Sequence, residues 1–310
     1  MRLFVLCGVL AALVVATPAS AQTPLEQGTA AYAAGDFDTA RRLLEPLAEE
    51  QDRVALTTLG AMYLEGLGVE RNDTRAFVLI SKAADLGVPE AQLIRAEMHA
   101  QGRGTPADDT AAARWYDSAA QQGLARAQYN LGVAYTRGRG VPRDATRAAT
   151  LFEQAAAQGD ADAQYNLAAM LAHGVGTAKD GPRALKLYTQ AAQSGNSAAL
   201  HALGLIYLEG NLVNADLDQA AAYIGQAARQ GYPQAQLNYA VLLLRGQGVE
   251  TDLGEAYTWL ELACASLPEG TLRRRAFDYR AYAGARLEGG EIDAARARAK
   301  AWEPEAPAQP

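Results

Sequence analysis

The chain has 310 residues, 49% of them hydrophobic, and a formal net charge of −7 at pH 7. This length and composition supply ample material for a continuous hydrophobic core. The acidic balance argues against nucleic acid and anionic lipid as the main partners.

Residues 1–21 have the organisation of a secretory signal peptide. One basic residue, Arg2, precedes an apolar run over residues 3–16, and Ala-Ser-Ala at residues 19–21 forms an A-x-A cleavage site. The apolar run is too short to span a membrane comfortably. We therefore predict export from the cytoplasm, with a mature chain that begins at Gln22 and is not inserted in the membrane. An uncleaved anchor is the alternative.

Residues 22–52 precede a repetitive region and have a pattern of their own. The positions that carry it are Tyr32, Gly35, Phe37, Ala40, Leu43 and Leu44. They resemble a tetratricopeptide hairpin. Terminal units of repeat arrays differ from inner units because one of their sides meets water. We therefore predict that residues 22–52 form a tetratricopeptide-like N-terminal capping hairpin.

Residues 53–267 contain one motif of 36 residues, written six times without an insertion. One alanine of the motif recurs at Ala55, Ala91, Ala127, Ala163, Ala199 and Ala235, and a second at Ala76, Ala112, Ala148, Ala184, Ala220 and Ala256. A glycine recurs at Gly66, Gly102, Gly138, Gly174, Gly210 and Gly246. A constant period of about 20 to 50 residues is typical of solenoids and other repeat arrays.

Each repeat has the pattern of two helices. In residues 127–162, apolar residues at steps of three and four predict a first helix that ends at Gly138. Gly140 allows the chain to reverse, and Asp144 is suited to cap the second helix. One helix pair cannot cover its own apolar face, so successive pairs must stack. We therefore predict an all-α fold, an α/α superhelical solenoid of helix-turn-helix repeats.

The phases A-Q-x-x-L-G, G-x-G-V, D-x-x-x-A and A-A-x-x-G resemble the Sel1-like repeat, a relative of the tetratricopeptide repeat. AQYNLG at residues 127–132 and GRGVPRD at residues 138–144 are especially similar. The resemblance implies an exported bacterial member of that family, with a superhelix that binds other proteins. For such a chain with a signal peptide we expect a periplasmic location, and secretion beyond the periplasm is the alternative.

The repeat pattern stops after the sixth copy, where Leu267 replaces the closing glycine. Two further helical stretches, Leu272–Ala283 and Glu291–Trp302, are separated by a pair of glycines. We predict that residues 268–302 form C-terminal capping helices. Residues 303–310 are rich in proline and alanine without periodicity, which predicts a disordered tail.

Two repeats depart from the motif. Repeat five has Leu212 where the others have the second glycine of G-x-G, and repeat two has Arg95 in a phase otherwise held by leucine or tyrosine. Each departure marks either a change in curvature, a docking point or a tolerated variation.

Neither a cofactor site nor a metal site is predicted. The G-x-G turns follow helices and lack the third glycine of a dinucleotide-binding loop and the Gly-Lys-Ser/Thr of a phosphate-binding loop. His99, His173 and His201 lie in different repeats and phases, so they give a metal site no local support. Cys264 occupies a phase held by alanine in other repeats, which favours a small buried residue over a reactive thiol or an intermolecular bridge.

Some proteins with this type of repeat are linked to β-lactam binding or hydrolysis. The present chain has no S-x-x-K, S-D-N or K-T-G motif, and it lacks the cysteine pair that those proteins carry in each repeat. We therefore predict a protein that is not an enzyme. A β-lactam or peptidoglycan-fragment binding protein with weak hydrolase activity is the alternative.

The remaining candidate site is a peptide-binding groove on the first helices. Two phases seven residues apart lie together beside the core stripe, and they supply the candidates Asn130, Arg137, Asn166, His173, Asn238 and Arg245. In tetratricopeptide-like arrays the first helices line the concave side. Asparagine amides there are expected to bind the backbone of an extended segment, and arginines its carboxylates.

These candidates define the expected function. They predict a scaffold or regulator whose partner is a protein or an extended peptide of the cell envelope. The alternative is that the asparagines belong to the repeat's own framework and that the arginines are merely solvated.

Overall fold

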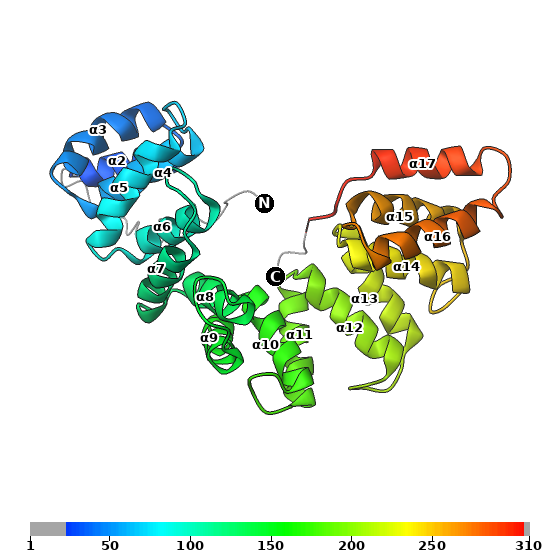
Figure 1. The fold of residues 1–310 in the computed structure, drawn as a ribbon. Helices are drawn as coiled ribbons and strands as arrows, with labels where there is room; N and C mark the ends of the chain where they lie inside the picture. The colour runs from blue at the N-terminus through cyan, green and yellow to red at the C-terminus, as the bar shows by residue number, and fades with distance from the viewer. Residues whose placement is uncertain (1–22, 307–310) are drawn as a thin grey trace, which may run out of the picture. The chain divides into compact units, whose positions relative to one another are not determined.

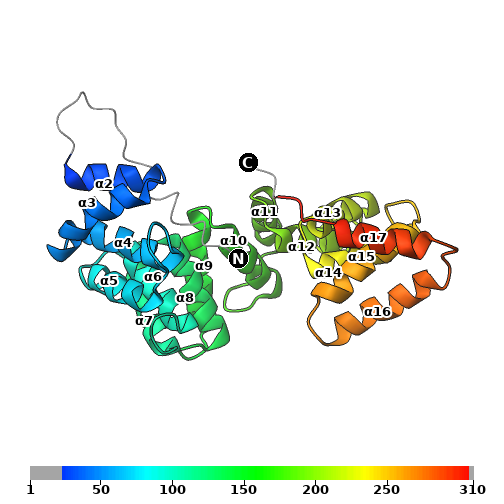
Figure 2. The ribbon, with the colours of Figure 1, turned by 90° about the horizontal axis from the view of Figure 1, so that it is seen from above.

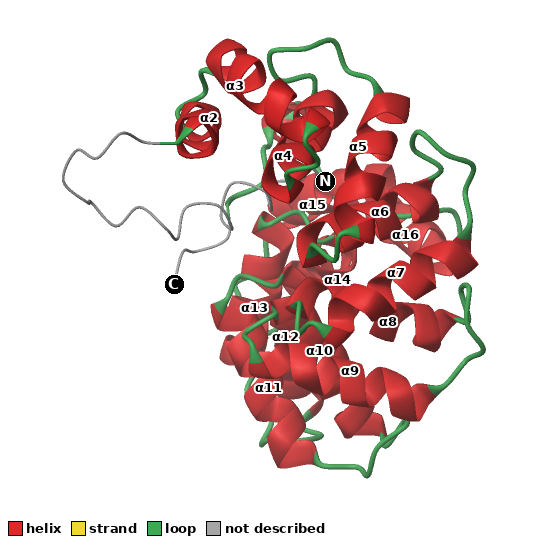
Figure 3. Ribbon diagram, turned by 90° about the vertical axis from the view of Figure 1, so that its left-hand side faces the viewer, coloured by secondary structure: helices red, strands yellow, loops and turns green. Residues whose placement is uncertain are grey.

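The computed structural model describes residues 23–306, and the predicted signal peptide lies outside the described residues. Within residues 23–306 the chain forms sixteen helices and no strand (Figures 1 and 3). The predicted all-α solenoid is therefore confirmed. The chain divides into two compact units, one ending at Leu151 and one beginning at Phe152, and each is described by itself.

The first unit contains the N-terminal hairpin and the first repeats. Its helices are α2 (Pro24–Ala33), α3 (Phe37–Glu49), α4 (Arg53–Glu65), α5 (Asp73–Asp85), α6 (Pro89–Gln101), α7 (Asp109–Gln121) and α8 (Ala125–Arg137). Each of these helices packs against the next one along the chain, and α2 also contacts α4 (Figure 1). The boundary between the units falls within α9 (Ala145–Ala157).

The second unit contains the later repeats and the C-terminal helices. These are α10 (Ala161–His173), α11 (Gly181–Gln193), α12 (Ser197–Glu209), α13 (Leu217–Arg229), α14 (Pro233–Arg245), α15 (Leu253–Ser266), α16 (Thr271–Gly284) and α17 (Glu291–Ala301). Successive helices pack together as far as α16, whereas α17 lies beside α15 (Figures 1 and 2).

The recurring alanines lie where the helices meet. All six of the first series are 0% exposed, and the second series is at most 2% exposed. An alanine side chain ends at Cβ, so neighbouring helices approach closely, and larger side chains such as Ile80 and Ile224 fill the remaining core. The 36-residue period is therefore a period of helix contacts.

Side-chain caps and left-handed glycines set the bounds of the repeat helices. At every predicted capping position the side-chain oxygen accepts the N–H three residues on, at 2.7–3.0 Å: Asn72, Asp108, Asp144, Asp180, Asp216 and Asp252. Each first helix ends at its predicted glycine, with φ between 63° and 72°. A residue without Cβ adopts this conformation at little cost and satisfies the last carbonyl groups of the helix.

A buried glutamine ties four of the repeats to the helix before them. Its Nε2 donates to the carbonyl oxygen eight residues earlier, at the end of the preceding second helix. The pairs are Gln92 with Ala84, Gln128 with Ala120, Gln164 with Ala156 and Gln236 with Ala228, at 3.3–3.5 Å. Each of these carbonyl oxygens also accepts the N–H of the glycine three residues on, so the glutamine of the A-Q pair supplies a second donor at the end of the helix.

The second glycine of the G-x-G turn rests directly on the backbone of the preceding repeat. A Cβ on Gly104 would lie 2.0 Å from the carbonyl oxygen of Asp73, and a Cβ on Gly140 would lie 1.9 Å from that of Asp109. Both glycines also have positive φ, 67° and 69°. The turn and the stacking of repeats therefore both require glycine at this position.

Repeat five makes the same contact, but the glycine lies in the preceding repeat instead of in the turn. Leu212 takes the place of the second turn glycine, and the residue it faces in the preceding repeat is Gly181. A Cβ on Gly181 would lie only 2.9 Å from Leu212 Cδ2. The departure of repeat five is therefore a paired exchange that preserves close packing.

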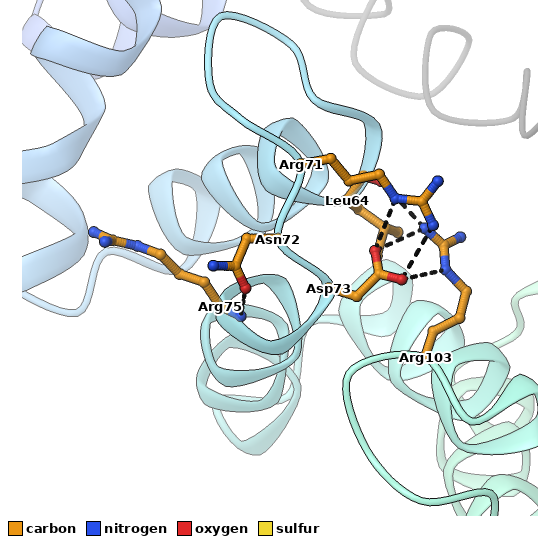
Figure 4. Close-up of polar contacts among 6 residues, drawn as sticks. All are labelled: Leu64, Arg71, Asn72, Asp73, Arg75 and Arg103. Carbon is orange, nitrogen blue, oxygen red and sulfur yellow. Dashed lines mark hydrogen bonds and ion pairs between the residues drawn. The ribbon is translucent and has the colours of Figure 1, made fainter.

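Ion pairs join consecutive repeats of the first unit beside these glycines. Arg103 donates to both carboxylate oxygens of Asp73, at 3.1 and 3.3 Å, and Arg71 flanks the same carboxylate (Figure 4). Hydrogen bonds from Arg71 and then from Arg103 lower the pKa of Asp73 to about 2. Arg139 and Asp109 repeat the pair one motif later, at 2.7 Å.

Arg95, the departure in repeat two, is held by aromatic and acidic neighbours. Its guanidinium carbon lies 4.1 Å from the centroid of the Trp115 ring and 5.9 Å from that of Phe77. One guanidinium nitrogen is 2.6 Å from Asp85 Oδ1. Cation–π contact and an ion pair thus replace the apolar contact that leucine or tyrosine makes in other repeats.

The two ends of the described chain are anchored locally. Thr23 and Glu26 form a reciprocal capping box at the start of α2. At the other end, the main-chain N–H of Glu305 donates to the carbonyl oxygen of Arg229 at 2.9 Å, so the first part of the predicted disordered tail lies on the second unit. Residues 307–310 of that tail lie outside the described residues. Across residues 23–306, no helix combines the length and apolarity needed to cross a membrane.

Replacing Gly104 by alanine tests the contact between turn and backbone, with Gly87→Ala as the matched control. Both glycines have positive φ, but a Cβ on Gly87 meets nothing within 4 Å. We expect Gly87→Ala to lower the free energy of unfolding by about 1 kcal/mol, the cost of the left-handed conformation alone, and Gly104→Ala by about 3 kcal/mol. Urea denaturation measures both. Equal losses would show that the close approach contributes nothing.

Candidate functional site

The six predicted groove residues lie on three first helices. Asn130 and Arg137 are on α8, Asn166 and His173 on α10, and Asn238 and Arg245 on α14. All three asparagines are half-buried, whereas Arg137, His173 and Arg245 are exposed. The asparagines therefore stand at the edge of the core, and the charged or imidazole groups two turns later face solvent.

In the first unit, Asn130 lines a cavity of about 150 Å³ between α7 and α8. Tyr116, Asp109 and Arg139 contribute polar groups to the same cavity, and alanines with Val133 supply its apolar wall. Since a water molecule needs about 30 Å³, the space accepts several waters or one side chain. Arg139 and Asp109 form the ion pair that joins two repeats, so their charges offset each other at this cavity.

Glu97 on α6 adds a half-buried carboxyl group beside Asn130. Burial raises its pKa, and the opposing influences are the charge of Arg126 and a hydrogen bond from Asn130. Burial, and next the charge of Glu97, raise the pKa of Tyr116. Tyr116 therefore remains a neutral phenol at physiological pH, with a hydroxyl that can both donate and accept.

In the second unit, Asn166 is engaged by its own helix. Its Nδ2 donates to the carbonyl oxygen of Asp162 at 2.7 Å. The Asp162 carboxylate in turn accepts from Nδ2 of Asn196 at 2.9 Å, which joins α10 to the start of α12. Asn166 thus has one amide hydrogen and its carbonyl oxygen left for other groups.

Asn238 contacts a histidine of the preceding repeat. Its Nδ2 lies 2.9 Å from Nε2 of His201, and the His201 ring packs 5.2 Å from the ring of Tyr232. Burial lowers the pKa of His201 to about 4, so the imidazole is neutral at physiological pH and its Nε2 accepts the amide hydrogen. Tyr165 and Tyr188 form a further aromatic pair in this unit, with ring centroids 5.8 Å apart.

Periodicity located the asparagines but not the groups around them. Glu97 occupies a phase that holds alanine, valine or leucine in the other repeats, whereas the phases of Tyr116 and His201 hold tyrosine in other repeats as well. Their roles depend on contacts between repeats, which a single-repeat pattern does not contain. A charged residue in an otherwise apolar phase is the signal that marks Glu97, and no comparable signal marks Tyr116 or His201.

The histidines and the cysteine are the residues whose metal-binding or nucleophilic chemistry was considered in the sequence. No group of three or more His, Cys, Asp or Glu side chains in this range is arranged to hold a metal ion. Cys264 on α15 is 4% exposed, and burial raises the pKa of its thiol. Both effects oppose formation of a reactive thiolate.

The buried His201 predicts a stability that falls in mild acid. Its pKa in the folded protein, about 4, lies below the value of 6.5 for a free histidine. As the pH falls from 6.5 towards 4, the unfolded chain gains a proton that the folded chain does not, so stability is complete above this window and decreases within it. We expect His201→Gln to flatten the decrease in a pH series of thermal midpoints. Parallel curves for parent and variant would contradict a buried neutral imidazole.

The comparisons with known proteins agree with this architecture. The Sel1 repeat family model matches residues 54–88, 89–124, 125–160, 161–196, 197–232 and 233–266. A Sel1 repeat protein from Oxalobacter formigenes is similar in structure, with a TM-score of 0.75 and 26% identity over 81% of this chain and 99% of that one. A protective antigen present in uropathogenic Escherichia coli, which displays an SLR fold, has a TM-score of 0.62 and 27% identity over 90% of this chain and 68% of that one.

No curated protein matches the chain. The six matched segments are contiguous from residue 54 to residue 266, which is more than half of the 310 residues. Their bounds coincide with the helix pairs that the caps and turn glycines define. The chain therefore belongs to the Sel1 repeat family.

Proposed function

We propose that this protein is an exported, non-catalytic scaffold or regulator that binds a protein or an extended peptide of the cell envelope. The Sel1 repeat is a helical scaffold typically used for protein–protein interaction, which supports a protein partner. Each unit has its own proposed contact surface on its first helices. In the first unit it carries Asn130 and Arg137 on α8, and in the second unit it carries Asn166, His173, Asn238 and Arg245 on α10 and α14. No feature of residues 23–306 favours the β-lactam alternative.

The cavity beside Asn130 carries the proposal. Asn130 is half-buried and lines a space of about 150 Å³, together with the hydroxyl of Tyr116. An asparagine amide has two donor hydrogens and an acceptor oxygen, so the contact with Glu97 leaves capacity for a ligand. A side chain of the partner fits the cavity, while the amide binds the partner's main chain.

The spacing between Asn130 and Arg137 indicates what the partner carries. Seven residues of α-helix advance about 10 Å, and an extended segment advances about 3.3 Å per residue. A segment that lies along α8 thus brings a carboxylate to Arg137 when the acidic residue is about three positions from the one at Asn130. Arg137 is exposed, so it meets such a carboxylate without first losing another buried contact.

The second unit offers the same kind of surface on α10 and α14. Asn166 and Asn238 each keep part of their hydrogen-bonding capacity after their contacts with Asp162 and His201. His173 and Arg245 are exposed two turns later on their helices. Within the second unit, two weak sites that bind one segment raise the total affinity, because the second contact forms within an already bound partner.

The proposal of export rests on residues 1–21, which contain an apolar run and end in the Ala-Ser-Ala cleavage site. The proposed location is the periplasm. Similarity to a protective antigen supports examining the culture medium as well as the periplasmic fraction.

The experiment recovers the mature chain from osmotic-shock fluid, confirms Gln22 as its first residue, and uses it to capture partners from detergent-solubilised envelope. The variant Asn130→Ala/Arg137→Ala removes an amide and a charge from one helix face. We expect it to weaken binding of the captured partner about tenfold or more, since hydrogen bonds to charged groups contribute about 1.5–3 kcal/mol.

Arg114→Ala serves as the matched control, because Arg114 is an exposed arginine that lies outside the proposed surface. It is on α7, the second helix of its repeat. We expect it to bind like the parent. Equal affinity of the double variant and the parent would contradict the proposed surface, and a full-length chain retained in the cytoplasm would contradict export.

A further inference from the structure

The C-terminal segment from Glu291 to Ala306 lies across the last repeat without being closely packed on it. Helix α17 sits beside α15, and its one buried residue is Ala295 (Figures 1 and 2). By contrast, α15 buries seven residues, among them Trp259. A helix with so little buried surface opens locally at low cost in free energy. We call residues 291–306 the C-terminal strap.

The space beneath the strap is incompletely filled. A cleft of about 1000 Å³ lies between the start of α15 and α17, with Thr258, Trp259, Arg298 and Trp302 among its lining residues. One polar contact bridges it at the edge, where Arg298 Nε donates to Thr258 Oγ1 at 3.3 Å. The Thr258 hydroxyl donates to the Gly254 carbonyl of its own helix at 2.9 Å and lies 3.4 Å from the Ala295 carbonyl oxygen. These contacts position α17 against α15 at the edge of the cleft.

The end of the strap is held by a specific set of contacts. Trp302 packs edge-to-face on Trp259, with ring centroids 6.1 Å apart. A Cβ on Gly231 would lie 3.3 Å from Trp302 Cη2, slightly closer than ordinary contact, and 3.5 Å from Pro304 Cβ, so both side chains lie directly against this glycine. The indole and the proline therefore fit a surface formed by α15 and the turn before α14.

Beyond Pro304 the strap binds like an extended peptide. The main-chain N–H of Glu305 donates to the Arg229 carbonyl at 2.9 Å, at the C-terminal end of α13. The Glu305 carboxylate lies 3.4 Å from Arg229 Nε. An aromatic anchor, one main-chain hydrogen bond and one ion pair are the contacts by which short extended segments are commonly recognised.

From these contacts we propose that Arg229, Gly231 and Trp259 form a peptide-binding site that the strap occupies in the free protein. Its exchangeable ligand is a partner segment with an aromatic residue followed three positions later by an acidic residue, in extended conformation. When such a segment binds, Trp302 is displaced and α17 is released from α15. This site is separate from the first-helix surfaces proposed above, and a result that contradicts one proposal leaves the other unaffected.

The strap competes at high effective concentration because it is part of the same chain. Its hinge is the linker from Ala285 to Gly290, which ends in two glycines. Intramolecular ligands on short flexible linkers act at effective concentrations on the order of millimolar. A free peptide with the same chemistry is therefore expected to bind weakly to the parent and more tightly once the strap is weakened.

The test uses the full mature chain and a fluorescein-labelled peptide with the sequence of residues 299–306, followed by fluorescence anisotropy. We expect the peptide to bind Trp302→Ala at least about tenfold more tightly than the parent. Glu305→Lys is a second, milder variant, because the Glu305 side chain is 60% exposed and its replacement leaves the core intact. It is expected to bind the peptide with intermediate affinity.

Two controls define specificity. A peptide with alanine in place of tryptophan is expected to bind none of the proteins, and Arg229→Ala in the Trp302→Ala background is expected to weaken binding. Equal peptide binding by the parent and both strap variants, or equal binding of the alanine peptide, would overturn the proposal. A parent dimer that becomes monomeric in Trp302→Ala would also overturn it, because the site would then serve a second copy of the chain.

Discussion

The contact between a turn glycine and a backbone carbonyl group of the preceding repeat determines how the helix pairs stack. At Gly104 and Gly140 the left-handed turn between the two helices of one repeat also lies against the first residue of the second helix of the preceding repeat. One residue type therefore satisfies a local requirement and a packing requirement together. The buried alanines and the glutamine bridges recur with the same period of 36 residues.

Features that depend on one repeat could be predicted from the sequence, whereas features that depend on the contact between two repeats could not. Helix ends, caps and the buried alanine series were predictable because each depends on neighbours within one repeat. Leu212 appeared as an isolated irregularity, since its explanation, Gly181, lies in the preceding repeat. Arg95 was unexplained for the same reason, because Asp85 and Phe77 of the preceding repeat complete its environment. Departures from a repeat motif are therefore best interpreted in pairs that face each other between repeats.

Prediction of the candidate site from the sequence has the same limit. Helical spacing placed Asn130, Asn166 and Asn238 on one face of their helices, and the structure leaves them half-buried at the edge of the core. Helical spacing did not predict that Glu97 approaches Asn130 or that His201 approaches Asn238, because the burial and the pKa of these groups depend on contacts between repeats. The C-terminal strap was predicted as a helix followed by a disordered tail. Its docking through Trp302 required knowledge of the surface at Gly231.

Because each repeat packs only on its neighbours, a substitution that destabilises the contact between two repeats is expected to affect only the repeats beside it. Native-state hydrogen exchange of Gly140→Ala, measured beside the parent, tests this directly, because a Cβ there would meet the Asp109 carbonyl oxygen at 1.9 Å. Faster exchange confined to α7 and α8, with unchanged protection in α13 to α15, is the predicted result. A uniform loss of protection across all described helices, or no loss at all, would contradict it.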